Sequence, residues 1–202
     1  MARILIAGGT GFIGQNLAIH LHERGHEIIA IGNNRRTCPK LDSHSIETHF
    51  ADLSTTPLDA ILANTGFDYV VNLSGYINHD QLDREGWGVF ESHTKCAVNL
   101  INALDHQRLR TFVQIGTSDE YGNTPAPQHE GQREQCLAPY SLAKLTNTHL
   151  VQTLSRTEGF PGVVVRPFLV YGPGQSKNRL IPHLIQQCLI NENFDTSLGE
   201  QL

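Results

Sequence analysis

The stretch RILIAGGTGFIGQNLA, residues 3–18, decides the fold. A short apolar run is followed at once by Gly8, Gly11 and Gly14, and then by an apolar pattern typical of a helix. Glycine allows the positive φ of a tight turn, and it lets the backbone approach a pyrophosphate because it has no Cβ. Free N–H groups at the start of the helix would face the phosphates. The stretch therefore predicts a strand, a dinucleotide-binding turn and a helix, with an ordinary glycine-rich turn as the alternative.

Length and composition are those of one globular α/β domain. The chain has 202 residues, and 39% of them are hydrophobic. Its 15 Lys and Arg against 20 Asp and Glu give a net charge of −5, which argues against a nucleic-acid binder. No apolar run is long enough to span a membrane, and the N-terminal run is too short for a signal peptide. The four cysteines form no C-x-x-C pair and no H-E-x-x-H occurs. We therefore predict no metal site, and we expect reduced thiols in a cytoplasmic protein.

Apolar runs of strand length alternate with helical patterns along the chain. This alternation predicts a Rossmann-type, doubly wound parallel sheet with helices on both faces. Strands are expected at residues 3–7, 27–31, 46–50, 69–73, 111–115 and 162–166. Helices are expected from Ile13 to Leu21, at residues 90–106 and 140–156, and after Pro182, with a loop at residues 123–131.

The end of the second predicted strand indicates the type of cofactor. An acid at this place would accept hydrogen bonds from the ribose hydroxyls of NAD, and it would repel a 2′-phosphate. Gly32 stands there instead, and Arg35 and Arg36 follow closely. Guanidinium groups suit a phosphate, so the sequence predicts NADP in preference to NAD, with Asn33 and Asn34 as further donors. The alternative is that the arginines are only a solvated pair.

Other strand ends supply further candidates for cofactor binding. Asp52 ends the third predicted strand, where a carboxylate can accept from the adenine amino group or serve only as a turn residue. The fourth predicted strand ends in VVNLSG, which should pass beside the cofactor. The cofactor-binding residues expected up to this point are Gly8, Thr10, Gly11, Phe12, Ile13, Gly14, Asn33, Arg35, Arg36, Asp52, Leu53, Leu73, Ser74 and Gly75.

The segment PYSLAK supplies a candidate catalytic pair. Tyr140 and Lys144 are four residues apart on a predicted helix, so they share one face. A free tyrosine has a pKa near 10, and a neighbouring lysine cation lowers it by stabilising the phenolate. The pair can therefore move a proton during alcohol–ketone interconversion, with hydride exchanged with a nicotinamide. Thr117 and Ser118, after the fifth predicted strand, can hold the reacting oxygen.

These motifs together resemble the extended short-chain dehydrogenase/reductase family, in its NAD(P)-dependent nucleotide-sugar epimerase/dehydratase/reductase group. The motifs are the glycine turn, Asp52, the strand end before Tyr121-Gly122, the Tyr140–Lys144 pair, and RPFLVYGPG from Arg166. They follow one another in the family's order over nearly the whole chain.

The resemblance implies roles for individual residues. Thr117, four before Tyr121, becomes the catalytic hydroxyl, with Ser118 as the fallback. Tyr140 becomes the acid–base group, and Lys144 its partner, which also binds the nicotinamide ribose. The segment after Pro167 would lie beside the nicotinamide.

The sequence also departs from the family's pattern at positions near the expected site. His93 occupies the place of a frequent asparagine, and Leu169 that of another in the substrate region. The acid after the second strand is absent, as described above. The nucleotide base and the sugar therefore stay open.

We predict an oxidoreductase or epimerase that acts on a nucleotide-diphosphate sugar. The alternative is a 4,6-dehydratase, which needs an additional acid and base. Asp119 and Glu120 could supply them, because Asp119 would point the same way as Thr117 in an extended strand. Equally, both acids could lie in a solvated turn. A second alternative is a catalytically silent NADP-binding or scaffold protein of the same fold.

We expect a dinucleotide-binding domain that carries the catalytic residues at 1–175, and the start of a substrate-binding region at 176–202. The family's chains are longer, so the resemblance implies that the C-terminal substrate-binding part is largely missing and that turnover by this chain is weak or absent. Lys177, Asn178 and Arg179 would remain from the substrate pocket, with the cations facing the diphosphate, or they would form a solvated loop. The predicted helices 90–106 and 140–156 carry apolar residues on more than one face, which predicts a homodimer.

Overall fold

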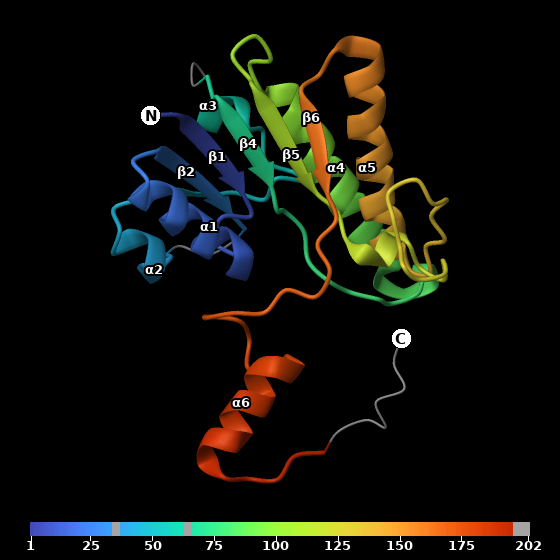
Figure 1. Ribbon diagram of the computed structural model, residues 1–202. Coiled ribbons are helices and arrows are strands. Elements are labelled where there is room, and N and C mark those ends of the chain that lie inside the picture. The colour runs from blue at the N-terminus through green and yellow to red at the C-terminus, as the bar shows by residue number, and fades with distance from the viewer. Residues whose placement is uncertain (34–36, 63–65, 196–202) are drawn as a thin grey trace. The chain divides into compact units, whose positions relative to one another are not determined.

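A computed structural model describes residues 1–33, 37–62 and 66–195 of the chain (Figure 1). The chain divides into two compact units, Met1–Phe168 and Leu169–Leu202. Each unit is described by itself.

The first unit is built on a parallel sheet of six strands in the order β3-β2-β1-β4-β5-β6 (Figure 1). From β1 the chain runs outward to β3, and it then returns to the other side of β1 with β4. This reversal is the point where doubly wound sheets bind ligands, beyond the carboxyl ends of the strands. The predicted Rossmann-type fold is confirmed. The strands are β1 Arg3–Ala7, β2 Glu27–Gly32, β3 Glu47–Phe50, β4 Tyr69–Asn72, β5 Thr111–Ile115 and β6 Gly162–Val165.

Helices cover the two faces of this sheet and enclose two apolar cores. Because side chains alternate along a strand, Ile4 and Ile6 of β1 point into one core and Leu5 into the other. The core that contains Ile4 and Ile6 lies beside α1 and α2, and the core that contains Leu5 lies beside α4 and α5. The helices are α1 Phe12–Glu23, α2 Pro39–Asp42, α3 Asp59–Leu62, α4 Trp87–Ala103 and α5 Pro139–Glu158.

The predicted elements differ from the observed ones mainly at their ends. The strands predicted at residues 3–7 and 111–115 have those same bounds, and the other four shift by a single residue at one end. Helix α4 begins three residues earlier than predicted, after a π-helical turn at Leu82–Gly86. It ends at Ala103 because Leu104 has an extended backbone, and the ring of His106 donates to the carbonyl of Ile101 over 2.8 Å.

The second unit contains helix α6, Leu180–Ile190. It begins two residues before Pro182, because proline is tolerated in the first helical turn, where its missing N–H has no partner to lose. Lys177, Asn178 and Arg179 are exposed in the turn that precedes α6.

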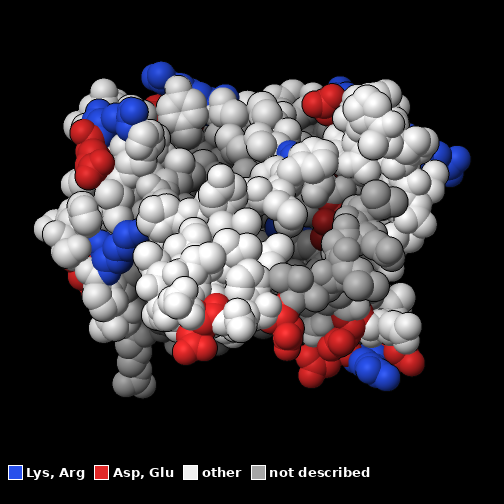
Figure 2. Space-filling model, turned by 60° about the horizontal axis from the view of Figure 1, so that its bottom comes forward, with Lys and Arg blue, Asp and Glu red and all other residues white. Residues whose placement is uncertain are grey.

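Charges are spread over the surface without a single dominant patch on the face in view. Figure 2 shows basic and acidic side chains in separate small groups among other residues. Within the described segments, no helix is both long and apolar enough to cross a membrane.

Candidate active site

The glycine turn has the close backbone packing that the sequence predicts. Gly8 has φ +79°, and a Cβ on it would lie 2.7 Å from the carbonyl carbon of Leu73 at the end of β4. A Cβ on Gly14 would collide with the carbonyl of Gly8. Gly11 is the N-cap of α1, and no side chain caps this helix. The turn can therefore receive a diphosphate at the helix start without clearing any side chain away.

Thr10 explains why β2 ends in glycine. A Cβ on Gly32 would lie 2.7 Å from the Cβ of Thr10 and would collide with the Thr10 methyl and hydroxyl groups. The side chain of Thr10 thus fills the space that a larger residue at position 32 would need. Asn33 is exposed, whereas Asn34, Arg35 and Arg36 lie outside the described residues.

Asp52 has the bonds of a turn residue. Its Oδ1 accepts from the backbone N–H of Ser54 over 2.9 Å and from the Ser54 hydroxyl over 2.6 Å. Its backbone carbonyl accepts from the N–H of Thr56. These bonds agree with the alternative that Asp52 is a turn residue, and its contact with adenine stays a prediction.

A chain of buried hydrogen bonds links the end of β4 to the candidate catalytic lysine. The Ser74 hydroxyl donates to Asn72 Oδ1 over 2.5 Å, and Asn72 Nδ2 donates to Gln114 Oε1 over 2.9 Å. Gln114 Nε2 donates to the carbonyl of Ile115, which also accepts from Lys144 Nζ, both over 3.1 Å. The end of β4 and Lys144 therefore belong to one polar network.

Tyr140 and Lys144 lie side by side on α5, as their spacing predicts. Lys144 Nζ lies 6.0 Å from the centre of the Tyr140 ring. The two side chains are only 7% and 5% exposed. Burial lowers the pKa of Lys144 to about 8, against the opposing effect of the Glu120 charge. A lysine in this state can both hold a proton near neutral pH and release it readily.

Two histidines that the sequence did not assign to the site flank the ring of Tyr140. His79 and His93 meet it edge to face, with ring centres at 5.5 and 5.4 Å. His93 is 2% exposed, and its Nε2 donates to the carbonyl of Tyr76 over 2.9 Å. A Cβ on Gly75 would collide with this ring. Burial, followed by the charge of Lys144, lowers the pKa of His93 to about 4, so it is neutral beside the tyrosine at pH 7.

The residues after β5 correct one of the predictions. They do not continue as a strand, because Thr117 caps a 3₁₀ helix at Ser118–Glu120. Thr117 Oγ1 accepts from the N–H of Asp119 over 3.3 Å, and the N–H of Thr117 donates to Glu120 Oε1 over 2.9 Å. The expected alignment of Asp119 with Thr117 along an extended strand is therefore wrong, and Asp119 is exposed in the turn.

Glu120 lies in neither of the two settings that the sequence predicted for it. It is fully buried, so the solvated turn is wrong for this residue. Its Oε2 accepts from the Thr148 hydroxyl over 2.9 Å and from Arg166 Nε over 2.7 Å. Both carboxylate oxygens are thus engaged within the protein, which does not suit an acid that must reach a substrate. Ser118 donates its N–H to the carbonyl of Pro167 over 3.1 Å, which joins the ends of β5 and β6.

Comparison with known proteins identifies the family to which this chain is similar. The model of the NAD-dependent epimerase/dehydratase family matches residues 4–200. An uncharacterised UDP-glucose epimerase of Bacillus subtilis is 29% identical over 93% of this chain and 62% of its own length. The dTDP-D-glucose 4,6-dehydratase of Dictyostelium discoideum is 26% identical over 94% of this chain and 49% of its own.

Solved structures show the same similarity. The UDP-glucuronic acid 4-epimerase of Bacillus cereus, in complex with NAD, has a TM-score of 0.78 and 25% identity, covering 94% of this chain and 64% of that one. The UDP-glucose 4-epimerase of Thermotoga maritima has a TM-score of 0.86 at 21% identity and supports the fold alone. The chain thus spans about half to two-thirds of the length of the relatives it matches.

Proposed function

The chain belongs to the NAD-dependent epimerase/dehydratase family, and on that premise we propose that it interconverts an alcohol and a ketone on a nucleotide-diphosphate sugar, as an epimerase or oxidoreductase. The observation that carries this proposal is the buried Tyr140–Lys144 pair beside the ends of β4 and β5. The relatives whose names specify UDP-sugars or dTDP-glucose support this class of substrate.

The tight turn at Gly8 and Gly14, whose backbone packs too closely for a Cβ atom, and the start of α1 at Gly11 without a side-chain cap suit the diphosphate of a dinucleotide. The residues that would hold the cofactor are the predicted set, with Ser74 and Gly75 at the end of β4 and Pro167 at the end of β6. When bound, the nicotinamide accepts or supplies the hydride.

The proton is handled by the chain's own side chains. The Tyr140 phenolate takes a proton from the sugar hydroxyl, the resulting Tyr140 hydroxyl returns it in the reverse step, and the Lys144 ammonium stabilises the phenolate. The Thr117 hydroxyl holds the reacting oxygen. His93 is neutral and buried, so it does not add a second positive charge beside the phenolate.

The test is turnover by the purified chain on a panel of UDP- and dTDP-sugars with NAD and NADP. Tyr140→Phe should lower kcat by about 100-fold or more, because it removes the acid–base group and leaves the ring. Tyr69→Phe, a change of the same kind on β4, should leave kcat unchanged. If Tyr140→Phe binds cofactor normally and no function changes, the silent binding protein is favoured instead.

The 4,6-dehydratase remains the second candidate, because relatives with that name match nearly the whole chain. The exposed Asp119 and the engaged Glu120 place it behind the epimerase or oxidoreductase. Release of a 4-keto-6-deoxy sugar from an unmodified nucleotide hexose would reverse this order.

A preference for NADP over NAD also belongs to the proposal. It rests on Gly32, which leaves no carboxylate to repel a 2′-phosphate, and on Arg35 and Arg36 as its partners. Titration with both cofactors tests it. Arg35→Ala with Arg36→Ala should weaken NADP binding alone, and NAD binding that is equal or tighter in the wild type would contradict it.

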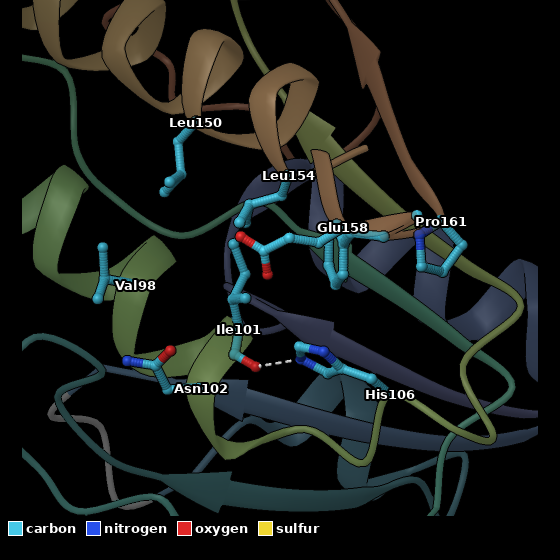
Figure 3. Close-up of a pocket in the computed structure, with 10 residues that line it drawn as sticks. Val98, Ile101, Asn102, His106, Leu150, Leu154, Glu158 and Pro161 are labelled. Carbon is cyan, nitrogen blue, oxygen red and sulfur yellow. Dashed lines mark hydrogen bonds between the residues drawn. The ribbon is translucent and has the colours of Figure 1, made fainter. Parts of the chain in front are cut away.

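We further propose a homodimer through α4 and α5. Trp87, Val98 and Leu142 are 56%, 42% and 41% exposed on these helices. Between the helices lies a hollow of about 300 Å³, lined by apolar residues together with Asn102, His106 and Glu158. In it, Leu150 and Leu154 point toward Val98 and Ile101 (Figure 3). Light scattering at micromolar concentration should give twice the monomer mass, and Val98→Asp should reduce it to the monomer.

A further inference from the structure

One buried carboxylate connects the segments that carry the candidate catalytic groups. Glu120 Oε1 accepts from the backbone N–H of Thr117, at the end of β5. Its Oε2 accepts from the hydroxyl of Thr148, one turn after Lys144 on α5. The same oxygen accepts from Arg166 Nε, directly after β6. Three elements that are distant in the sequence therefore meet at one side chain.

The surrounding residues are arranged to keep this carboxylate in place. A Cβ on Gly116 would collide with Glu120 Oε1, so glycine leaves the room that the carboxylate occupies. Arg166 is held in turn by Glu134, with Nη2 2.7 Å from Oε1, and its guanidinium lies 4.9 Å from the centre of the Tyr121 ring. A buried charge is costly unless it is paired and hydrogen-bonded, and both conditions hold for Glu120.

We propose that Glu120 is a positioning residue that fixes Thr117 relative to Tyr140 and Lys144. This inference rests on the proposed function, since it concerns the geometry of that reaction. Thr117 holds the reacting oxygen only if its backbone is fixed, and the bond from its N–H to Glu120 provides that constraint. Displacement of a reacting group by about 1 Å can lower a rate by about 100-fold.

The charge of Glu120 has a second effect, on Lys144. Burial lowers the pKa of Lys144, and Glu120 is the largest influence that raises it. Without this charge, Lys144 would lose its proton at a lower pH. The alkaline limb of the pH–activity profile, where loss of the Lys144 proton lowers kcat, should then move to lower pH. A purely structural role for Glu120 would not produce that shift.

Glu120→Gln tests the proposal, with Glu134→Gln as the matched control. Both carboxylates lie 2.7 Å from Arg166, but Glu120 is the one that accepts from the N–H of Thr117. We expect Glu120→Gln to lower kcat by about tenfold or more, to leave KM and cofactor affinity within about twofold, and to move the alkaline limb to lower pH. Glu134→Gln should lower kcat less than Glu120→Gln does and should leave the limb unchanged, because its amide oxygen can still accept from Arg166.

A second pair of variants, with milder changes, tests the proposal if Glu120→Gln does not fold. Thr148→Val removes one donor to the carboxylate and keeps the ion pair, and it should lower kcat by about threefold. Thr146→Val is its control, because that hydroxyl donates to the carbonyl of Leu142 on the same helix.

Amide hydrogen exchange gives a readout that needs no turnover. Peptides containing Thr117 should exchange faster in Glu120→Gln than in Glu134→Gln. Equal exchange in both variants, or an equal loss of kcat, would overturn the positioning role. Turnover that Tyr140→Phe leaves unchanged would instead overturn the proposed function, and the exchange comparison would still decide whether Glu120 holds Thr117.

Discussion

Residues around the glycine turn are matched in size, and Gly32, which leaves space for the side chain of Thr10, is the clearest case. We expect Gly32→Asp to weaken binding of both NAD and NADP rather than to create a preference for NAD. The new side chain would collide with Thr10, and such overpacking costs about 1–3 kcal/mol of unfolding free energy. Urea unfolding and titration with both cofactors measure the two effects.

The double variant Thr10→Gly with Gly32→Asp is the control for this explanation. It removes the methyl and hydroxyl groups that collide, so it should recover the stability lost in Gly32→Asp. The explanation fails if Gly32→Asp alone is as stable as the wild type.

His93 should make the protein sensitive to acid. Burial lowers its pKa from 6.5 to about 4, so the unfolded chain binds more protons than the folded one between these pH values. Unfolding free energy should therefore fall as the pH drops from about 6.5 to about 4, by up to about 3 kcal/mol. Above pH 6.5 this contribution is constant.

Urea unfolding of His93→Gln at a series of pH values checks this dependence. The amide can still donate toward the carbonyl of Tyr76, but it does not titrate. Its stability should vary less between pH 6.5 and pH 4 than that of the wild type. Equal slopes in the two proteins would show that His93 is not the group responsible.

The start of α1 depends on the close approach of backbone atoms within the glycine turn. Gly14→Ala should lower unfolding free energy by about 1–3 kcal/mol, because the added Cβ meets the backbone of Gly8 and Gly9, which cannot rotate away. Gly11→Ala is the matched control, since its nearest neighbour, the Gly8 carbonyl oxygen, would lie at 3.2 Å. Thermal unfolding compares the two variants, and equal losses would contradict the explanation.

The regular elements could be predicted from the sequence because their signals are local. A strand such as β1 is a continuous apolar run after Arg3, and α5 carries its periodicity over 20 residues. The 3₁₀ helix at Ser118–Glu120 could not be predicted from apolar runs or periodicity. It forms because Thr117 and Glu120 make a capping box, whose Thr-x-x-Glu spacing is a local signal of a helix start. That Glu120 is also drawn inward by Thr148 and Arg166 has no local signal, because these partners lie 28 and 46 residues away.

The tertiary fold brings together site residues whose proximity the sequence does not reveal. The proximity of Tyr140 and Lys144 could be predicted because residues four apart on a helix lie on the same face. His79 and His93 lie 61 and 47 residues before Tyr140, and only the fold brings their rings to it. The contacts of Glu120 with Thr148 and Arg166 likewise span 28 and 46 residues. Such pairs depend on the packing of α4, α5 and β6, which a single sequence does not specify.

The first unit should fold and bind cofactor by itself. It contains all six strands, both apolar cores, and the Tyr140–Lys144 pair. A fragment of residues 1–175 should therefore unfold cooperatively, with a Tm within a few degrees of the 202-residue chain, because it keeps every buried residue of both cores. Its affinity for NAD and NADP should match that of the full chain. A fragment that is unfolded, or that binds neither cofactor while the 202-residue chain does, would show that residues 176–202 contribute to the stability of the first unit. The same fragment should bind nucleotide sugar more weakly than the full chain if Lys177, Asn178 and Arg179 belong to the substrate pocket, so titration with both ligands separates the two roles.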